Sequence, residues 1–243
     1  MSLYVAFGGG INSTAMLIGM AERGISPQWI IFADTAGEKP ETYRHVDDVS
    51  AWLVAHGQKP IVTVRKASMY ASLEDECLKK NTLPALAFGF RSCSDKWKQQ
   101  PQQKYLNNNE DARAEWKAGR KIAKAIGFGV DELYRAKPFE DDKYVNWYPL
   151  IDWRWNRNDC IEAIKRAGLA VPPKSSCFYC PAMHKSEILE LKKTHPTLYA
   201  RALEIESNAT AAHSVAGLGR SFSWQEMTGP ETVEQTCICF DGE

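Results

Sequence analysis

Three consecutive glycines between a strand pattern and a helix pattern restrict the fold of this chain more than any other feature. Residues 3–7 form a short apolar run, residues 8–10 are glycine, and residues 13–23 carry apolar side chains at helical spacing. Glycine lets the backbone approach phosphate oxygens closely, and the N–H groups at the start of a helix favour an anion. Ser13 and Thr14 add hydroxyl donors. The segment predicts a phosphate-binding loop; a glycine turn that only permits tight packing is the alternative.

The next segments continue an alternation of strands and helices. Residues 29–33 (WIIFA) form a buried-strand run, Pro40 opens a helical pattern that Gly57 ends, and residues 61–64 form a third apolar run. This β-α-β-α-β order predicts an α/β fold with a parallel sheet and helices on both faces. The glycine loop is not a Walker loop, because no lysine precedes its serine and threonine, and it lacks the GxGxxG spacing.

Length and charge narrow the class of protein. The 243 residues are 44% hydrophobic and 25% charged, which suits one sizeable core or one core with a small appended lobe. Thirty basic and thirty acidic residues cancel, so the sequence does not indicate a general nucleic-acid coat, although it is compatible with a local basic face. No run reaches the ~18 apolar residues of a membrane span, and the first residues lack a signal-peptide pattern. We therefore expect a cytoplasmic protein with no membrane partner.

Seven cysteines, an odd number without a secretion signal, argue against a disulfide framework. Cys177 and Cys180 in the segment SSCFYCP are the strongest metal signal, because two thiolates three positions apart in a turn can bind one metal or a cluster. A redox dithiol is the alternative, but a thioredoxin-like pair follows a strand in a βαβ unit, whereas this pair follows Lys-Ser-Ser in a loop. Cys77 lies in an ordinary helical pattern (LEDECLKK), where we expect a structural role.

Four segments in a fixed order resemble one family. The loop FGGGINSTAML looks like the SGGxDS loop of the N-type ATP pyrophosphatase (PP-loop) superfamily. The segments IIFADTAGEKPETYRHV, RSCSDKWKQQP, and YPLIDW followed by SSCFYCP are similar to those of its phosphoadenosine-phosphosulfate-reductase-like branch, in a divergent form of the phage or mobile-element type. The matches span residues 3–206, so we expect a nucleotide-binding domain over residues 1–206. The resemblance implies a Rossmann-like (adenine nucleotide alpha hydrolase-like) sheet of five parallel strands, helices on both faces and a cysteine-containing C-terminal helical segment.

The resemblance also implies where ATP or a related adenine nucleotide would bind. Its phosphates would lie on the first loop, with Asp34 and Thr35 near the base or ribose. Glu38 would line the entrance or cap the helix that begins near Pro40. Cations beside the third segment would bind phosphate or sulfate. The expected nucleotide-binding residues are Gly8, Gly9, Gly10, Asn12, Ser13, Thr14, Asp34, Thr35, Glu38, Arg91 and Lys98.

Two positions of the loop depart from the family pattern. The family loop begins with serine and carries aspartate, whereas Gly8 and Asn12 stand at those positions here. Asn12 can still form hydrogen bonds, but it brings no negative charge to hold Mg²⁺. We expect phosphate binding to survive this change; efficient release of pyrophosphate is the weaker expectation.

The resemblance adds a third cysteine to the metal site. Iron–sulfur members of the branch combine a pair such as Cys177 and Cys180 with a cysteine of the earlier segment, which here is Cys93. Cys160 is open between two roles, a further metal ligand and a small buried apolar residue. Three thiolates would leave one iron of a [4Fe–4S] cluster open to substrate, and four would close it. Zinc suits the same ligands equally well.

The C-terminal part is expected to contain the cysteine segment, over residues 147–206, and a mobile tail over residues 207–243. Sulfonucleotide reductases carry a reactive cysteine on such a tail. The candidate catalytic residues are therefore Cys237 and Cys239, with Lys96 from the third segment. The Cys-x-Cys pair lacks the family's Glu-Cys-Gly-x-His pattern, so an inert or metal-closing tail is an equal expectation.

Two enzymatic chemistries and one binding role follow from these features. The first chemistry is reduction of a sulfonucleotide by a tail cysteine. The second is adenylation of an acceptor oxygen by ATP, with release of pyrophosphate, followed by sulfur insertion. Expected partners are a nucleic-acid acceptor, a reductant or sulfur-donor protein, and a second copy in a homodimer. The alternative role is a nucleotide-binding module without turnover, stabilised by zinc, which Asn12 favours.

Overall fold

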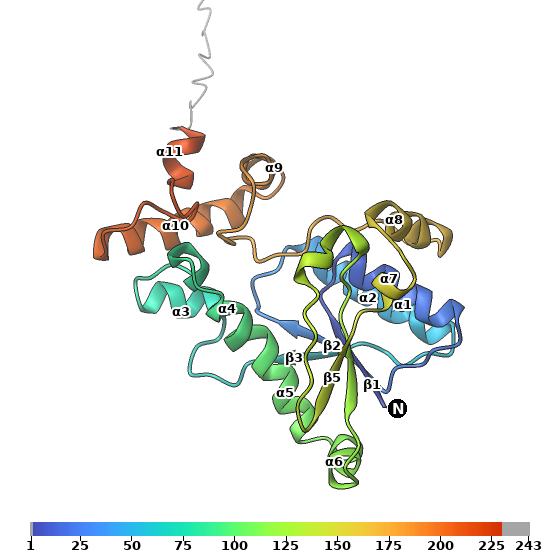
Figure 1. Cartoon of the computed structure of the whole chain (residues 1–243). Helices are drawn as coiled ribbons and strands as arrows, with labels where there is room; N and C mark the ends of the chain where they lie inside the picture. The colour runs from blue at the N-terminus through green and yellow to red at the C-terminus, as the bar shows by residue number, and fades with distance from the viewer. Residues whose placement is uncertain (1, 230–243) are drawn as a thin grey trace, which may run out of the picture.

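A five-stranded sheet forms the centre of the protein (Figure 1). The computed structural model describes residues 2–229. All neighbouring strands pair in parallel, in the order β3-β2-β1-β4-β5. The strands are β1 (Leu3–Phe7), β2 (Trp29–Asp34), β3 (Val62–Arg65), β4 (Ile122–Ala125) and β5 (Tyr144–Trp147). The expected α/β class is confirmed, and the sheet has a Rossmann-like arrangement.

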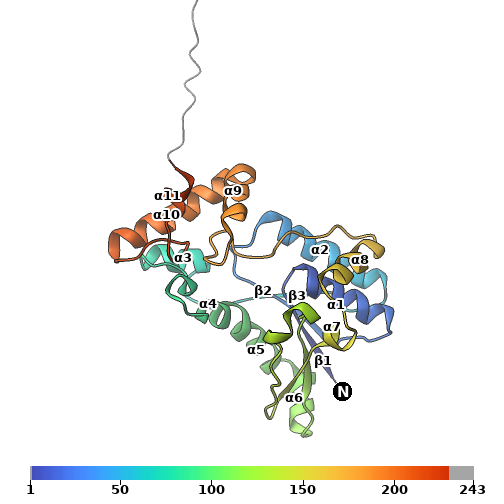
Figure 2. The ribbon, with the colours of Figure 1, turned by 45° about the horizontal axis from the view of Figure 1, so that its top comes forward.

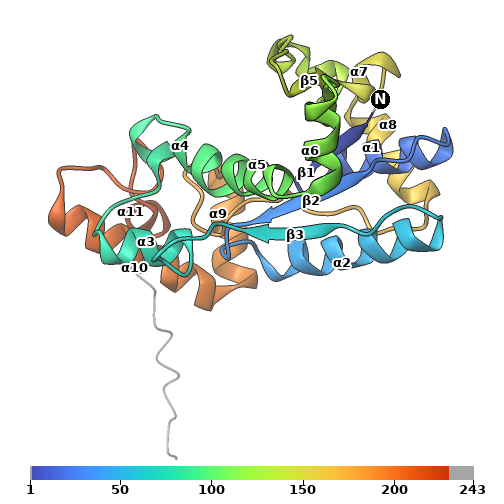
Figure 3. The ribbon, with the colours of Figure 1, turned by 90° about the horizontal axis from the view of Figure 1, so that it is seen from below.

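Helices lie on both faces of the sheet, and Figure 3 shows α2 and α5 on opposite sides of β2 and β3. None of the helices within residues 2–229 combines the length and the apolar character that a membrane span requires. The helical elements are α1 (Ile11–Glu22), α2 (Pro40–Ala55), α3 (Leu73–Lys79), η1 (Ala85–Phe88), α4 (Ser92–Ser94), η2 (Asp95–Gln99), α5 (Gln100–Asn107), α6 (Glu110–Lys117), η3 (Val130–Arg135), α7 (Pro149–Asp152), α8 (Arg157–Arg166), α9 (Lys185–Thr194), α10 (Pro196–Ala212) and α11 (Trp224–Thr228).

Alternation along β1 assigns its side chains to two layers. Leu3, Val5 and Phe7 join the core that contains residues of α1, α2 and α8. Tyr4 points to the other face, where it shares a smaller core with Leu106 of α5. Successive side chains of a strand point to opposite faces, so a central strand buried on both sides reads as a continuous apolar run.

The chain changes direction across the sheet at β1. It runs from β1 through β2 to β3 on one side, and then crosses to β4 and β5 on the other side of β1. In open α/β sheets, ligands bind outside the carboxyl ends of the strands at such a point. The glycine loop follows β1 and residues 126–129 follow β4, so the topology places both loops at this edge.

Helices α3, α9, α10 and α11 build a second core beside the sheet (Figure 2). The cysteine segment enters this core through Cys177, which precedes α9. The helical C-terminal segment implied by the resemblance is therefore present.

The described part of the segment expected as a tail from residue 207 packs on the helices. Helix α10 continues through this boundary to Ala212, and Leu218 and Trp224 are fully buried against it. Apolar burial of this kind holds the segment on the helices, so it is not a free tail. Residues 230–243 lie outside the described part of the chain.

Candidate functional site

The glycine loop joins β1 to α1 at the carboxyl edge of the sheet. Gly9 has a φ of +70°, and a Cβ there would lie 3.2 Å from Cγ2 of Thr42 in α2. Both facts favour glycine. Gly10 caps α1 in an extended conformation, and its carbonyl accepts the first helical hydrogen bond from the nitrogen of Thr14 (3.0 Å). The N–H groups of residues 11–13 therefore lie at the positive end of α1, which is the backbone geometry that the predicted phosphate site requires.

Two hydroxyls of the loop have different surroundings. The hydroxyl of Ser13 stays within the loop and donates to the carbonyl of Gly10 (3.1 Å). Thr14 is fully buried, and its hydroxyl shares a hydrogen bond with Nε2 of His45 in α2 (2.8 Å). Burial lowers the pKa of His45. Ser13 thus lies where a phosphate would bind, whereas Thr14 ties α1 to α2.

Asn12 is held by two elements from the other half of the chain. Its Nδ2 donates to Oε2 of Glu132 in η3 (2.8 Å), and its Oδ1 accepts a long hydrogen bond from Arg157 in α8 (3.4 Å). The resembled family has aspartate at this position. Here Asn12 carries no charge, but the carboxylate of Glu132, its hydrogen-bond partner, brings a negative charge next to it. Glu132 could not be predicted as the partner of Asn12, because 120 residues separate the two positions.

Residues 126–129, Ile-Gly-Phe-Gly, form a second loop against the start of α1. A Cβ at Gly127 would lie 3.0 Å from the backbone nitrogen of Ser13. The nitrogen of Ile126 donates to the carbonyl of Trp147 in β5 (3.0 Å). Glycine allows this close approach of the two loops. The paired glycines of this segment were the only signal of it in the sequence.

The end of β2 carries two buried polar residues with fixed partners. Oδ1 of Asp34 accepts from the hydroxyl of Tyr43 (2.8 Å) and from the nitrogen of Ala36 (2.7 Å). Its Oδ2 pairs with the guanidinium of Arg65 (2.6 Å). Asp34 therefore holds together the residues that follow β2, and it has few lone pairs left to accept hydrogen bonds from a ribose. Thr35 instead hydrogen-bonds with the thiol of Cys177 (Oγ1 to Sγ, 3.1 Å).

The cysteine turn packs directly on the loop that follows β2. Glu38 and Cys177 form an isolated antiparallel bridge, and the nitrogen of Phe178 donates to the carbonyl of Gly37 (2.8 Å). A Cβ at Gly37 would lie 2.5 Å from the hydroxyl of the buried Tyr179. The two predicted sites, for nucleotide and for metal, thus meet at one edge of the sheet.

Lys98 and Glu38 form an ion pair beside this turn (Nζ to Oε1, 2.9 Å), and the side chain of Glu38 is fully buried. Burial acts to lower the pKa of Lys98, but the carboxylate of Glu38 and the thiol of Cys177 outweigh it and raise the pKa. Lys98 would have to share this partner in order to bind a phosphate. Glu38 does not cap α2, which begins after Lys39 without a side-chain cap.

The second core contains four cysteines, where α3, α4 and the cysteine turn meet: Cys77, Cys93, Cys177 and Cys180. Burial, then Glu76, then Cys177 and Cys93 raise the pKa of Cys77 to about 12. Burial raises the pKa of Cys180 as well, with a contribution from Cys93. Thiols in such surroundings are mostly protonated at neutral pH and would lose a proton on binding a metal.

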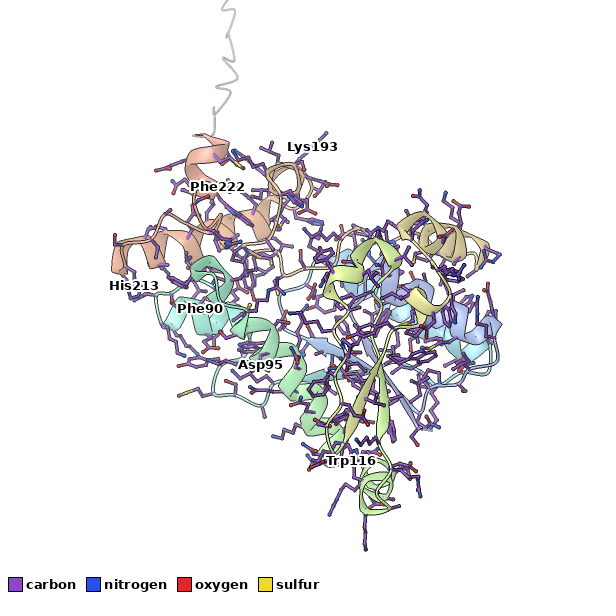
Figure 4. All side chains as sticks on the ribbon, in the orientation of Figure 1. Phe90, Asp95, Trp116, Lys193, His213 and Phe222 are labelled. Carbon is purple, nitrogen blue, oxygen red and sulfur yellow. The ribbon has the colours of Figure 1, made fainter. Side chains whose placement is uncertain are left out.

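Cys77 and Cys93 line one cavity of about 210 Å³, together with Lys96 and Trp97. Lys96 is exposed, as is Arg91 at the start of α4; Figure 4 labels Asp95 and Phe90 in the same region. Over residues 2–229, no three His, Cys, Asp or Glu side chains already point to a common metal position. Metal binding would therefore require the thiols to turn toward each other.

The structure places Cys160 away from these thiols. It is fully buried in the core between α8 and α1, with charged neighbours such as Asp131 and Asp159. Of the two roles left open for Cys160, its burial in a different core from the other cysteines favours that of a small buried residue. Cys77, for which we expected a structural role, is buried in the second core, which also contains Cys93, Cys177 and Cys180. The predicted catalytic residues Cys237 and Cys239 lie outside the described residues.

Comparison with known proteins gives one distant similarity and no family. No protein-family model matches the chain. An uncharacterized protein of Methanocaldococcus jannaschii is 25% identical over 206 residues, which cover 81% of this chain and 40% of the relative. The chain thus spans less than half the length of this curated relative.

Proposed function

We propose that this chain binds an adenine nucleotide at the glycine loop and uses a cysteine-bound [4Fe–4S] cluster beside it in ATP-dependent sulfur transfer. The contact between Thr35 and Cys177 (3.1 Å) carries the proposal, because it joins the nucleotide edge of the sheet to the cysteine turn. A metal that served only to stabilise the helical lobe would not need to adjoin the carboxyl ends of the strands, where ligands of such sheets bind.

The loop residues supply the nucleotide half of the proposed site. The N–H groups of residues 11–13 and the hydroxyl of Ser13 would bind phosphate oxygens, and Gly127 would leave room for them at the second loop. The carboxylate of Glu132 beside Asn12 supports a role for Mg²⁺, which prefers oxygen ligands.

The four gathered thiols supply the metal half. Cys93, Cys177 and Cys180 would hold the cluster, and Cys77 is the fourth thiol within reach. A bound cluster supplies electron transfer, or an iron that binds sulfide when three thiolates hold it. The buried pair of Glu38 and Lys98 keeps this side of the site balanced in charge.

The favoured chemistry activates an oxygen of the acceptor. That oxygen attacks the α-phosphorus of ATP, and pyrophosphate leaves. Sulfide from a donor protein then displaces AMP, so sulfur replaces the acceptor oxygen. Lys96 beside the cysteine cavity would balance charge on the phosphates. Reduction of a sulfonucleotide by Cys237 or Cys239 is the second proposal, and it differs in requiring the tail.

Anaerobic purification followed by absorption and by iron, zinc and sulfide analysis tests this function. We expect a broad band near ~400 nm and about four irons and four sulfides per chain. ATP should bind, and Ser13→Ala should weaken its binding, whereas the matched variant Ser26→Ala, remote from the loop, should not. One zinc without sulfide, together with ATP binding, would contradict sulfur transfer and leave a nucleotide-binding module with a structural metal.

A further inference from the structure

A groove of about 640 Å³ lies on the sheet face that α5 and α6 cover only in part. This volume is in the range of ligand pockets. Its floor consists of alternate side chains of three strands, among them Tyr4 of β1, Lys124 of β4 and Tyr144 of β5. Gln103 of α5 lines the opposite side. The groove shares no residue with the cysteine cavity, so it is a separate site.

One wall of the groove is fixed by hydrogen bonds to β5 and the residue after it. This wall is the segment 136–141, which precedes β5 (Figure 1). The hydroxyl of Tyr148 donates to the carbonyl of Lys137 (2.6 Å), and the nitrogen of Asn146 donates to the carbonyl of Phe139 (2.9 Å). The wall is therefore built into the fold and does not need a ligand to form.

The charges of the groove suit an anion. Lys124, Arg135 and Lys137 line it, against one carboxylate, Asp141. Of these three cations, Arg135 is already paired with Glu132. Asp141 caps the turn before β5 and accepts two backbone N–H groups there. Among residues 2–229, no carboxylate forms an ion pair with Lys124 or Lys137. Burial lowers the pKa of Lys124, and a bound phosphate would act in the opposite direction by favouring the charged form.

Aromatic rings lie beside these cations. Phe128 and Tyr148 stack with centroids 5.9 Å apart and planes at 12°, and the guanidinium of Arg135 lies 4.3 Å from the Phe128 centroid. Phe139 on the wall is 51% exposed. The hydroxyl of the buried Tyr144 has no hydrogen-bond partner in the described part of the chain. An unpaired buried hydroxyl is costly, and a polar ligand in the groove would satisfy it.

One end of the groove lies beside a loop that contacts the start of α1. Trp116 of α6, labelled in Figure 4, packs edge-on against Tyr144 (centroids 5.6 Å apart) at the amino end of β5. At the other end, Phe128 belongs to the same loop as Gly127, which touches the start of α1. The loop that closes this end of the groove therefore also contacts the nucleotide loop.

We propose that this groove binds one nucleotide of a single-stranded nucleic acid, with its base on the aromatic wall and its phosphate between Lys124 and Lys137. Bases of any sequence stack on aromatic rings beside cations in single-strand binding sites. Duplex binding needs a wider basic face, which a chain with no net charge does not indicate. The proposal rests on the proposed function only in identifying this strand as the sulfur acceptor.

Fluorescence anisotropy with a labelled single strand of about 12 nucleotides, within the usual site sizes, tests the groove in the full chain. Lys137→Gln should lower the slope of log Kd against log salt by about 0.7, the value for one phosphate of a single strand. Phe139→Ser should weaken binding about 5-fold or more without changing this slope, because it removes stacking. Both residues are exposed, so neither variant removes core packing.

Matched controls decide the outcome. Lys59→Gln changes an exposed lysine outside the groove, and Leu189→Ser changes an apolar residue of equal exposure on α9 (52%). Three results would overturn the proposal. The first is an equal loss of single-strand affinity in the control variants. The others are tighter binding of a duplex than of the single strand, and full displacement of the single strand by ATP. ATP affinity, measured separately, should not change in the groove variants. If the wild-type protein does not bind ATP, but the groove variants still weaken binding of the single strand, the proposed function is overturned and the groove proposal stands.

Discussion

The position of Cys77 beside Cys93 and Cys177 makes a test of the metal site possible at single residues. We expect Cys77→Ala to lower the metal content per folded chain by about half or more, because a lost thiolate weakens coordination. Cys160→Ala removes a thiol of equal size from the other core, and we expect its metal content to equal that of the wild type. Both variants remove packing contacts of a buried side chain and lower stability, so the metal content is measured on the folded fraction only. Equal metal loss in both variants would contradict the site.

The cysteines show what a sequence can and cannot predict about single residues. The spacing of Cys177 and Cys180 places both in one turn, and this could be read from the sequence. The presence of Cys77 in the same core could not, because LEDECLKK is an ordinary helical pattern and the packing of α3 on the cysteine turn is set by the fold. Asn12 is a similar case: its departure from the family was visible, but its partner Glu132 is set by the fold.

Whole elements were predictable where their ends carried signals. The first three strands are bounded by glycine, proline or polar residues, so they and the helices between them were found. Strands β4 (IAKA) and β5 (YVNW) have four residues each, and Lys124 and Asn146 interrupt their apolar pattern. These two polar residues line the groove. Local sequence patterns therefore did not predict β4 and β5, the strands that line the groove. The expectation of five strands came from the family resemblance alone.

The segment that ends in α11 depends on one buried carboxylate, Glu206 of α10. Its two oxygens accept four hydrogen bonds of 2.6–3.1 Å, which come from the nitrogens of residues 218, 224 and 225 and the hydroxyl of Ser223. We expect Glu206→Gln to destabilise the protein by about 2–4 kcal/mol, because the amide nitrogen cannot accept and one buried oxygen is lost. Urea unfolding measures the loss, with exchange of amides in α11 as a local readout. Glu204→Gln on the exposed side of α10 is the control, and an equal effect there would contradict this role.

At the scale of the whole molecule, the sheet and the helical lobe are joined by contacts between distant parts of the chain. Glu74 of α3 pairs with Arg201 of α10 within the lobe. Lys98 and Glu38 tie η2 to the end of β2, and Glu41 at the start of α2 bonds His195 at the junction of α9 and α10 (2.6 Å). The cysteine turn lies between these ties, so the relative position of the two cores also sets the geometry of the candidate site.

The bond between Glu41 and His195 predicts a pH dependence. Burial acts to raise the pKa of Glu41, but hydrogen bonds from its own backbone and from His195, with the charges of His195 and Lys39, lower it below 4.5. A carboxyl whose folded pKa is depressed stabilises the fold above its unfolded pKa and loses this effect as the pH falls through the folded pKa. Because both side chains are partly exposed, we expect Glu41→Gln to cost roughly 0.5–1 kcal/mol at pH 6. The difference between variant and wild type should start to shrink as the pH falls below about 4.5 and should be lost as the pH falls through the folded pKa, as followed by urea unfolding at each pH. A difference that stays constant down to pH 3 would show that Glu41 acts by packing and not by its charge.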